Sequence, residues 1–157
     1  MQLGPPENSF FIYDMAYWEV DYGAFQANIG VIESQPAGDD ATSYFIAPYE
    51  LHGDWRSYSR LIFEKRSWGG TYYGPDEYGA HGDVIIRNGD MSARLDIPQD
   101  HTQNWQRYTI ALDGRGWTLS GGANSLSDVL ANVTSLQIRA EYGGGDDYSS
   151  LARVTRE

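Results

Sequence analysis

The chain has 157 residues, with 11 Lys and Arg against 22 Asp and Glu, a formal net charge of −11, and no cysteine. This length suits one domain with a core of its own, so we expect a single domain over residues 1–157. The lack of cysteine excludes disulfides, thiol catalysis and Cys-ligated metal sites. So acidic a surface repels phosphate groups, which argues against nucleic acid and anionic membranes as partners.

The sequence has no stretch near the roughly 18 apolar residues of a membrane span, so we expect no membrane insertion. The first residues have neither a basic n-region nor an apolar h-region, and we expect no signal peptide in this chain. The chain is then either intracellular or a module taken from a larger secreted protein.

Short alternating runs bounded by turn residues predict an all-β protein. The expected strands cover residues 10–13, 17–22, 24–33, 43–47, 60–65, 83–87, 91–97, 105–112, 134–141 and 150–155. Asn88-Gly89, between two of these runs, is a strong signal for a two-residue hairpin turn. The Gly-rich segments 67–82 and 143–147 are predicted to be loops.

The segment 125–133 departs from this alternation, because its apolar residues have the i, i+3, i+4, i+7 spacing of a short helix. These apolar residues are Leu126, Val129, Leu130 and Val133. Ser125 or Ser127 can cap the helix. About ten short strands and one short helix favour a β-sandwich.

Glu19 and Asp21 form the most enzyme-like feature, since residues i and i+2 of a strand share a face. A nucleophile and an acid about 5–5.5 Å apart suit a retaining glycosidase. β-Sandwich glycosidases with this spacing carry a third carboxylate further along the strand, whereas Ala24 stands at that position here. The three histidines are isolated, so no zinc motif is present either. We therefore expect no catalytic residue and keep a small glycan-active enzyme only as a third hypothesis.

The segment 67–80 is the best candidate for a ligand site, because its aromatic residues stand among glycines outside any alternating run. Aromatic faces stack on the C–H faces of sugar rings, and carboxylates accept hydrogen bonds from sugar hydroxyls. The candidate carbohydrate-binding residues are Trp68, Tyr72, Tyr73, Asp76, Glu77 and Tyr78. Two alternatives stay open: these rings cover an edge of the core, or they contact another protein, since exposed Tyr and Trp are enriched in interfaces.

A series of stretches between residues 43 and 156 carries a family resemblance. In chain order they are Tyr44-Phe-Ile-Ala-Pro48, Gly53-Asp-Trp55, Leu61-Ile-Phe63, Gly82-Asp-Val-Ile-Ile-Arg-Asn-Gly89, Asn104-Trp-Gln-Arg-Tyr-Thr109, Leu112-Asp113, Gly116-Trp117 and Val129-Leu-Ala-Asn-Val-Thr-Ser-Leu-Gln-Ile-Arg-Ala-Glu-Tyr142. Taken together, they resemble the laminin B (domain IV) module in the form found in bacterial secreted proteins. The resemblance implies a jelly-roll-like β-sandwich related to galactose-binding-like carbohydrate modules, and a non-catalytic, extracellular role.

Many relatives of this sandwich hold a structural calcium ion between the first and last strands, as the resemblance implies. The bacterial pattern often ends in Leu-Asp-Asn-Val, but this chain has Leu151-Ala-Arg-Val154, in which both polar acceptors are replaced. We therefore expect that no cofactor is required. Asp14 is the one residue of the opening strand that is carried over as a candidate calcium ligand.

These observations lead to one main functional hypothesis and one alternative. The main hypothesis is a non-catalytic carbohydrate-binding or adhesion module of a secreted bacterial protein, with a polysaccharide or glycan as its partner. The alternative is a structural or self-assembly module, whose aromatic loops contact neighbouring domains or other copies of the chain. Both hypotheses place the chain outside the cell.

Overall fold

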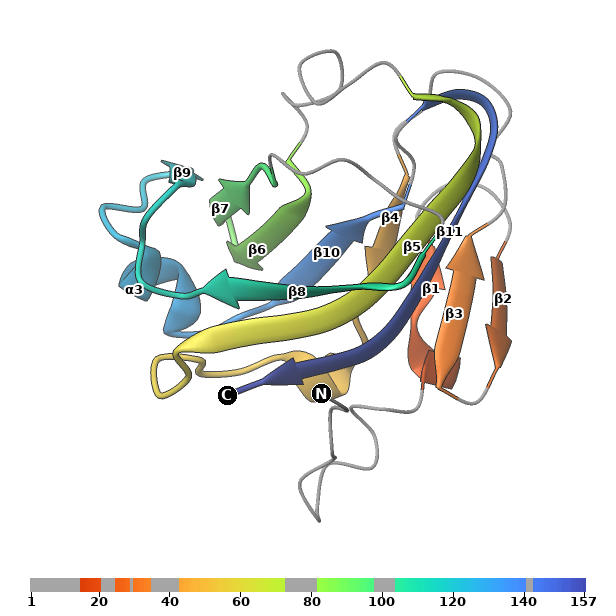
Figure 1. Ribbon diagram of the computed structural model, residues 1–157. Coiled ribbons are helices and arrows are strands. Elements are labelled where there is room, and N and C mark those ends of the chain that lie inside the picture. Colours follow the sequence, from red (N-terminus) through yellow and green to blue (C-terminus); the bar gives the residue numbers. More distant parts are fainter. Residues whose placement is uncertain are drawn as a thin grey trace.

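The computed structural model describes residues 15–20, 25–28, 30–34, 43–72, 82–97, 104–140 and 143–157. Over these residues two antiparallel sheets pack face to face (Figure 1). The strand order is β1-β4-β10-β6-β7-β9 in the six-stranded sheet and β2-β3-β11-β5-β8 in the five-stranded sheet. The predicted jelly-roll-like β-sandwich with one short helix is confirmed for the described part of the chain.

The elements follow one another along the chain with short connections. In order they are the 3₁₀-helix η1 (Met15–Tyr17), β1 (Glu19–Val20), β2 (Phe25–Asn28), β3 (Val31–Ser34), β4 (Tyr44–Ile46), the 3₁₀-helix η2 (Tyr49–Leu51), β5 (Arg60–Tyr72), β6 (Val84–Asn88), β7 (Met91–Leu95), β8 (Gln106–Ala111), β9 (Trp117–Ser120), the helix α3 (Leu126–Leu130), β10 (Ser135–Arg139) and β11 (Gly143–Arg156).

The strands β5 and β11 are much longer than predicted and run side by side across the molecule (Figure 1). Their register extends from Tyr72 opposite Gly143 to Leu61 opposite Arg156. The prediction of loops was therefore wrong for residues 67–72 and 143–147. Glycine lowers the local preference for strand, but here each Gly-rich segment finds its backbone partner in the other, and pairing across the sheet outweighs local preference.

Two other predictions near the N-terminal end need correction. Residues 24–33 were predicted to form one strand, but they form β2 and β3, which pair with each other. The chain reverses at Gly30, whose φ of +83° is a conformation that favours glycine. Tyr17 lies in η1 rather than in a strand. The predicted strand at 10–13 lies outside the described residues.

Further along the chain, residues 117–120 form β9, a strand that the alternation did not predict.

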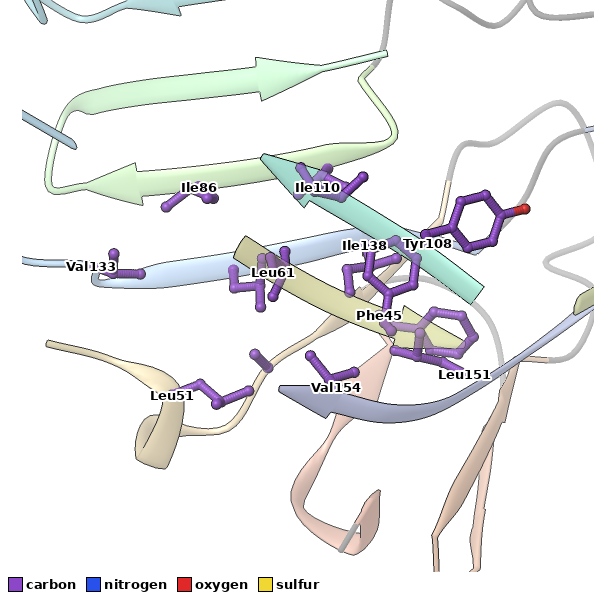
Figure 2. Close-up of a cluster of buried hydrophobic side chains, with 14 of the residues drawn as sticks. Phe45, Leu51, Leu61, Ile86, Tyr108, Ile110, Val133, Ile138, Leu151 and Val154 are labelled. Atoms are coloured by element: carbon purple, nitrogen blue, oxygen red, sulfur yellow. The ribbon is translucent and has the colours of Figure 1, made fainter. Parts of the chain in front are cut away.

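The core fills the space between the sheets, as Figure 2 shows for Phe45, Leu61, Ile138 and other apolar side chains. On β5, Leu61 and Phe63 point into this space, and the Phe63 ring stacks on Tyr108 of β8 with centroids 5.2 Å apart. Successive side chains of a strand point to opposite faces. The alternate residues of β5, which include Arg66 and Trp68, therefore lie on the outer face of the five-stranded sheet.

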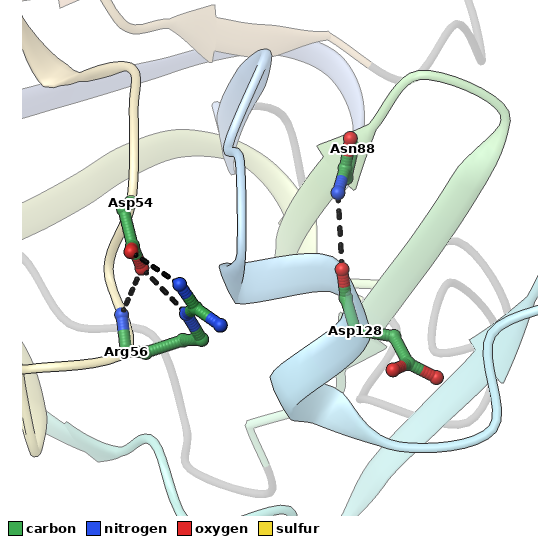
Figure 3. A network of polar contacts seen from close by, with 4 residues as sticks. All are labelled: Asp54, Arg56, Asn88 and Asp128. Carbon is green, nitrogen blue, oxygen red and sulfur yellow. Dashed lines mark hydrogen bonds and ion pairs between the residues drawn. The ribbon is translucent and has the colours of Figure 1, made fainter.

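The helix α3 begins at a capping box formed by Ser125, which is one of the two cap residues that the sequence left open, and Asp128. The Asp128 N–H donates to Ser125 Oγ at 3.2 Å, and the Ser125 N–H donates to the Asp128 carboxylate at 3.2 Å. Asn88 of the β6–β7 hairpin donates its side-chain N–H to the carbonyl oxygen of Asp128 at 3.0 Å, which ties the helix to the hairpin (Figure 3). The helix ends before Val133, which forms a bridge with Gly53 instead.

Ser125→Ala should lower the free energy of unfolding by about 1 kcal/mol, because the substitution removes the acceptor of the capping bond. Ser127→Ala is the matched control, since Ser127 does not cap the helix, and it should change stability by less than about 0.5 kcal/mol. Urea unfolding of both variants measures the difference. Equal stability of the two variants would show that the cap contributes nothing.

Candidate functional site

A cluster of aromatic rings lies on the outer face of the five-stranded sheet. Trp68 of β5 is directly opposite Tyr148 of β11. The two rings stack with centroids 5.6 Å apart and planes 10° apart. The pair results from the sheet register, because residues that face each other on adjacent antiparallel strands have neighbouring side chains.

Arg66 and Trp105 extend this cluster across the sheet. The guanidinium carbon of Arg66 lies over two indole rings, 4.8 Å from the centroid of Trp68 and 5.0 Å from that of Trp105. Trp105 immediately precedes β8, whose Gln106 pairs with Lys65, so the register brings Trp105 beside Arg66. We call Trp105, Arg66, Trp68 and Tyr148 the aromatic face.

The charges beside the aromatic face are held by local contacts. Ser150, opposite Arg66, donates from Oγ to Glu33 Oε2 of β3 at 3.4 Å. Glu64 forms an ion pair with Arg153, with Nε and Oε2 3.5 Å apart. The Arg66 side chain forms no ion pair or hydrogen bond with any described residue, and its Nε is buried without a partner. The aromatic face therefore contains a cation that none of the described acidic residues neutralises.

A buried charged cluster lies on the other side of the same strand. Lys65 is only 2% exposed, and its Nζ donates to the carbonyl oxygen of Arg139 at 3.1 Å. Asp83 lies 3.9 Å from the Arg139 guanidinium and accepts from the Ile97 N–H at 2.6 Å. Burial lowers the pKa of Lys65 to about 7 and raises the pKa of Asp83. The adjacent basic residues of β5 thus lie in different environments: Lys65 is inside the sandwich, and Arg66 is on the aromatic face.

Of the predicted carbohydrate-binding residues, the structure places Trp68 on the aromatic face. For Tyr72 it describes the backbone, which ends β5 opposite Gly143. The other candidates, Tyr73, Asp76, Glu77 and Tyr78, and the candidate calcium ligand Asp14, lie outside the described residues. Their roles stay predictions.

Sequence reasoning missed Trp105, Arg66 and Tyr148. For Trp105 a signal was present but was not used: the alternation in 105–112 places it with Arg107 and Thr109 on the polar side of the strand, where a large apolar ring is unusual. Arg66 and Tyr148 gave no such signal, because their positions depend on the pairing of β5 with β11.

Two surface hollows lie elsewhere on the molecule. One, of about 340 Å³, is lined by Tyr17, Glu19, Tyr49 and Glu50 beside the edge strand β1, and its two tyrosines are 56% and 81% exposed. The other, of about 610 Å³, lies between the loop at Arg56 and the start of α3.

The polar groups of the second hollow already have partners within the chain. Arg56 donates to both carboxylate oxygens of Asp54, at 3.0 and 2.7 Å (Figure 3). These hydrogen bonds lower the pKa of Asp54 to about 2. Ser125 caps α3, and Asp113 accepts from the Arg115 N–H at 3.0 Å. This hollow therefore offers few free groups to a ligand.

Of the calcium site that the resemblance implied, only the residues of the last strand are described, because Asp14 lies outside the described residues. At the end of β11, Ala152 is buried and the cation Arg153 is paired with Glu64. Within the described ranges no three His, Asp or Glu side chains come together as metal ligands would. Glu19 is exposed on β1, and the other member of the enzyme-like pair, Asp21, lies outside the described residues.

Two packed antiparallel sheets with one short helix define a jelly-roll module similar in fold to carbohydrate-binding modules. Residues 44–157 match the family model of Laminin B (Domain IV). The chain belongs to this family. Within the part of the chain that the structure describes, no helix is both long and apolar enough to cross a membrane.

Solved structures support the same assignment at the level of the fold. The chain is similar to the L4b domain of human laminin alpha-2, with a TM-score of 0.68 and 16% identity over 86% of this chain and 83% of that one. It is also similar to the family 11 carbohydrate-binding module of cellulosomal cellulase Lic26A-Cel5E from Clostridium thermocellum, with a TM-score of 0.54 and 11% identity over 89% and 86% of the two chains.

A third similar structure is the agarase AgWH50C, with a TM-score of 0.59 and 10% identity. The similarity covers 88% of this chain but only 22% of the agarase, so it concerns a small part of that enzyme. No curated protein matches this chain in sequence.

Proposed function

We propose that the chain is a non-catalytic carbohydrate-binding module of a secreted protein, and that it binds polysaccharide on the aromatic face. The observation that carries this proposal is the ring cluster on the outer side of a sheet, where Trp68 and Tyr148 stack and the Arg66 guanidinium lies over both Trp68 and Trp105. Such rings offer broad apolar surfaces on which the C–H faces of sugar rings can stack.

Packing between the two sheets does not account for these rings. The core of the sandwich lies between the sheets, whereas the aromatic face lies on the opposite side of β5, β8 and β11. Trp105 is 41% exposed and is one of three large exposed hydrophobic residues in the described part of the chain. Large exposed rings that gather at one place are typical of binding surfaces.

Trp68→Ala and Trp105→Ala should each weaken retention by a bound polysaccharide by about 1–2 kcal/mol, a factor of roughly 5–30. Affinity electrophoresis against a panel of neutral and acidic polysaccharides measures the retention. Tyr49→Ala is the matched control, because Tyr49 is also exposed but lies beside a different strand. Unchanged retention in both tryptophan variants, with the fold intact, would rule out the aromatic face as the site.

A second candidate function is self-assembly or contact with neighbouring domains. Its support is the hollow beside the edge strand β1, where Tyr17 and Tyr49 are exposed. An edge strand presents unpaired backbone groups to another chain, and exposed tyrosines are enriched in interfaces. Sedimentation over a range of concentrations distinguishes the two functions: a mass that rises with concentration and returns to that of a monomer in Tyr49→Ser favours assembly.

A further inference from the structure

The arginine of the aromatic face bears on the kind of polysaccharide that would bind there. We propose that this face selects glycans that carry carboxylates, such as polyuronates, and that Arg66 pairs with a uronate carboxylate while Trp68 and Trp105 stack on the sugar rings. This inference rests on the proposed function and adds the chemical class of the ligand.

The first support is the position of the Arg66 guanidinium. It lies over two indoles, at 4.8 and 5.0 Å from their centroids, so the rings hold it in place. A guanidinium that is already ordered loses little entropy when it forms further hydrogen bonds. Its planar array of N–H groups matches a carboxylate, with which it can form two parallel hydrogen bonds.

The second support is that the Arg66 side chain has no acidic partner among the described residues, although the chain is rich in acids. Five other arginines of the described residues form ion pairs with carboxylates, namely Arg56, Arg60, Arg115, Arg139 and Arg153. Arg66 forms none with a described residue, and its Nε is buried without a hydrogen bond, as is that of Arg156, which lies over Trp55 and Tyr58. An unsatisfied charged group is costly in the folded protein. A ligand carboxylate would supply the missing counter-charge.

The net charge of −11 does not exclude an acidic ligand at this place. At physiological ionic strength charges are screened over about 8 Å, so the groups nearest the ligand dominate. The register of the sheet places Arg107 beside Glu64, which also pairs with Arg153, and Glu33 near Ser150. With Arg66, the charged residues of this outer face include three arginines against these two glutamates, so the described surface there is not acidic.

The experiment compares one polymer with and without its carboxylates. Polygalacturonate and the same polymer after reduction of its carboxyl groups are placed in native gels at about 0.15 M salt, with neutral β-glucan and a sulfated galactan in parallel. We expect polygalacturonate to retard the protein and the reduced polymer to retard it at least tenfold less. Arg66→Met, which keeps the apolar stem between the rings, should lose the retardation. Arg66→Lys should recover only part of it, because an ammonium lacks the planar donor array.

The controls separate the two levels of the proposal. Arg115→Met, far more exposed and outside the aromatic face, should behave like the parent protein. Thermal unfolding of each variant confirms that it is folded. Two results would overturn the inference and leave the proposed function intact. One is equal retardation by the carboxylated and the reduced polymer, and the other is a retardation of Arg66→Met that equals that of the parent protein. Retention by the sulfated galactan or the neutral glucan alone would also overturn it. No retardation by any polymer would overturn both.

Discussion

Gly121→Ala should destabilise the domain by about 3–5 kcal/mol, the largest effect that we expect from a single substitution. A Cβ atom at this position would lie 1.9 Å from the carbonyl oxygen of Asp90 and 2.9 Å from Cα of Met91. Both contacts are with backbone atoms of the β6–β7 hairpin, which cannot move without disturbing the pairing of β7 with β9. The φ of +71° adds a conformational cost for any residue with a side chain.

The neighbouring glycine provides a matched control. Gly122 has a φ of +89°, but a Cβ there meets nothing within 4 Å. Gly122→Ala should therefore lower the free energy of unfolding only by the cost of the left-handed backbone conformation, about 1–2 kcal/mol. Urea unfolding of both variants isolates the effect of the close approach. Similar stabilities of the two variants would mean that the hairpin and the end of β9 separate at little cost.

Lys65→Met should remove a rise in stability that the parent protein shows between about pH 7 and pH 10. Burial lowers the pKa of Lys65 from 10.5 to about 7 in the folded state. Between these values the unfolded chain binds the proton and the folded chain does not. The free energy of unfolding therefore rises with pH across this window, by at most about 1.4 kcal/mol per pH unit. Below pH 7 the folded protein carries the full cost of a buried ammonium.

Denaturant unfolding from pH 6 to pH 9.5 tests this prediction. The difference in stability between the parent protein and Lys65→Met should change with pH, whereas the difference for Arg66→Met, one residue along the strand on the other face, should stay constant. A constant difference for both variants would show that Lys65 titrates as an exposed lysine does. Asp83 acts with the opposite sign at acidic pH: because burial raises its pKa, the folded state holds the proton longer, and stability falls as the pH rises through that range.

The sequence predicted the elements whose signal is local. The Asn88-Gly89 turn joins β6 to β7 as expected, and Ser125 caps α3 because the donor and acceptor lie within one turn of helix. The ends of β5 and β11 were missed, since their Gly-rich segments become strand only by pairing with each other. A local sequence pattern does not predict which distant segment a strand will pair with.

The same division applies to the candidate site. Trp68 was recognised because it is an aromatic residue outside an apolar run, a property of its own neighbourhood in sequence. Trp105 and Tyr148 were not recognised, because Trp105 precedes β8 and Tyr148 lies in β11, and they reach β5 only in the register of the folded sheet. Arg66 was missed because the predicted strand ended at residue 65, whereas β5 continues to Tyr72. Of the other predicted residues of that segment, the structure describes only the backbone of Tyr72. The aromatic face therefore contains one predicted residue, Trp68, and three that were not predicted.

The position of β11 has a consequence for how the domain is made in the cell. This strand lies between β3 and β5, and it follows all the other described strands of the domain in the sequence. Until it arrives, β3 and β5 each present an unpaired edge, which is the kind of surface that promotes aggregation of nascent chains. Folding is then expected to follow synthesis of the C-terminal segment rather than accompany elongation, and the demand for chaperones should be greatest just before that segment emerges.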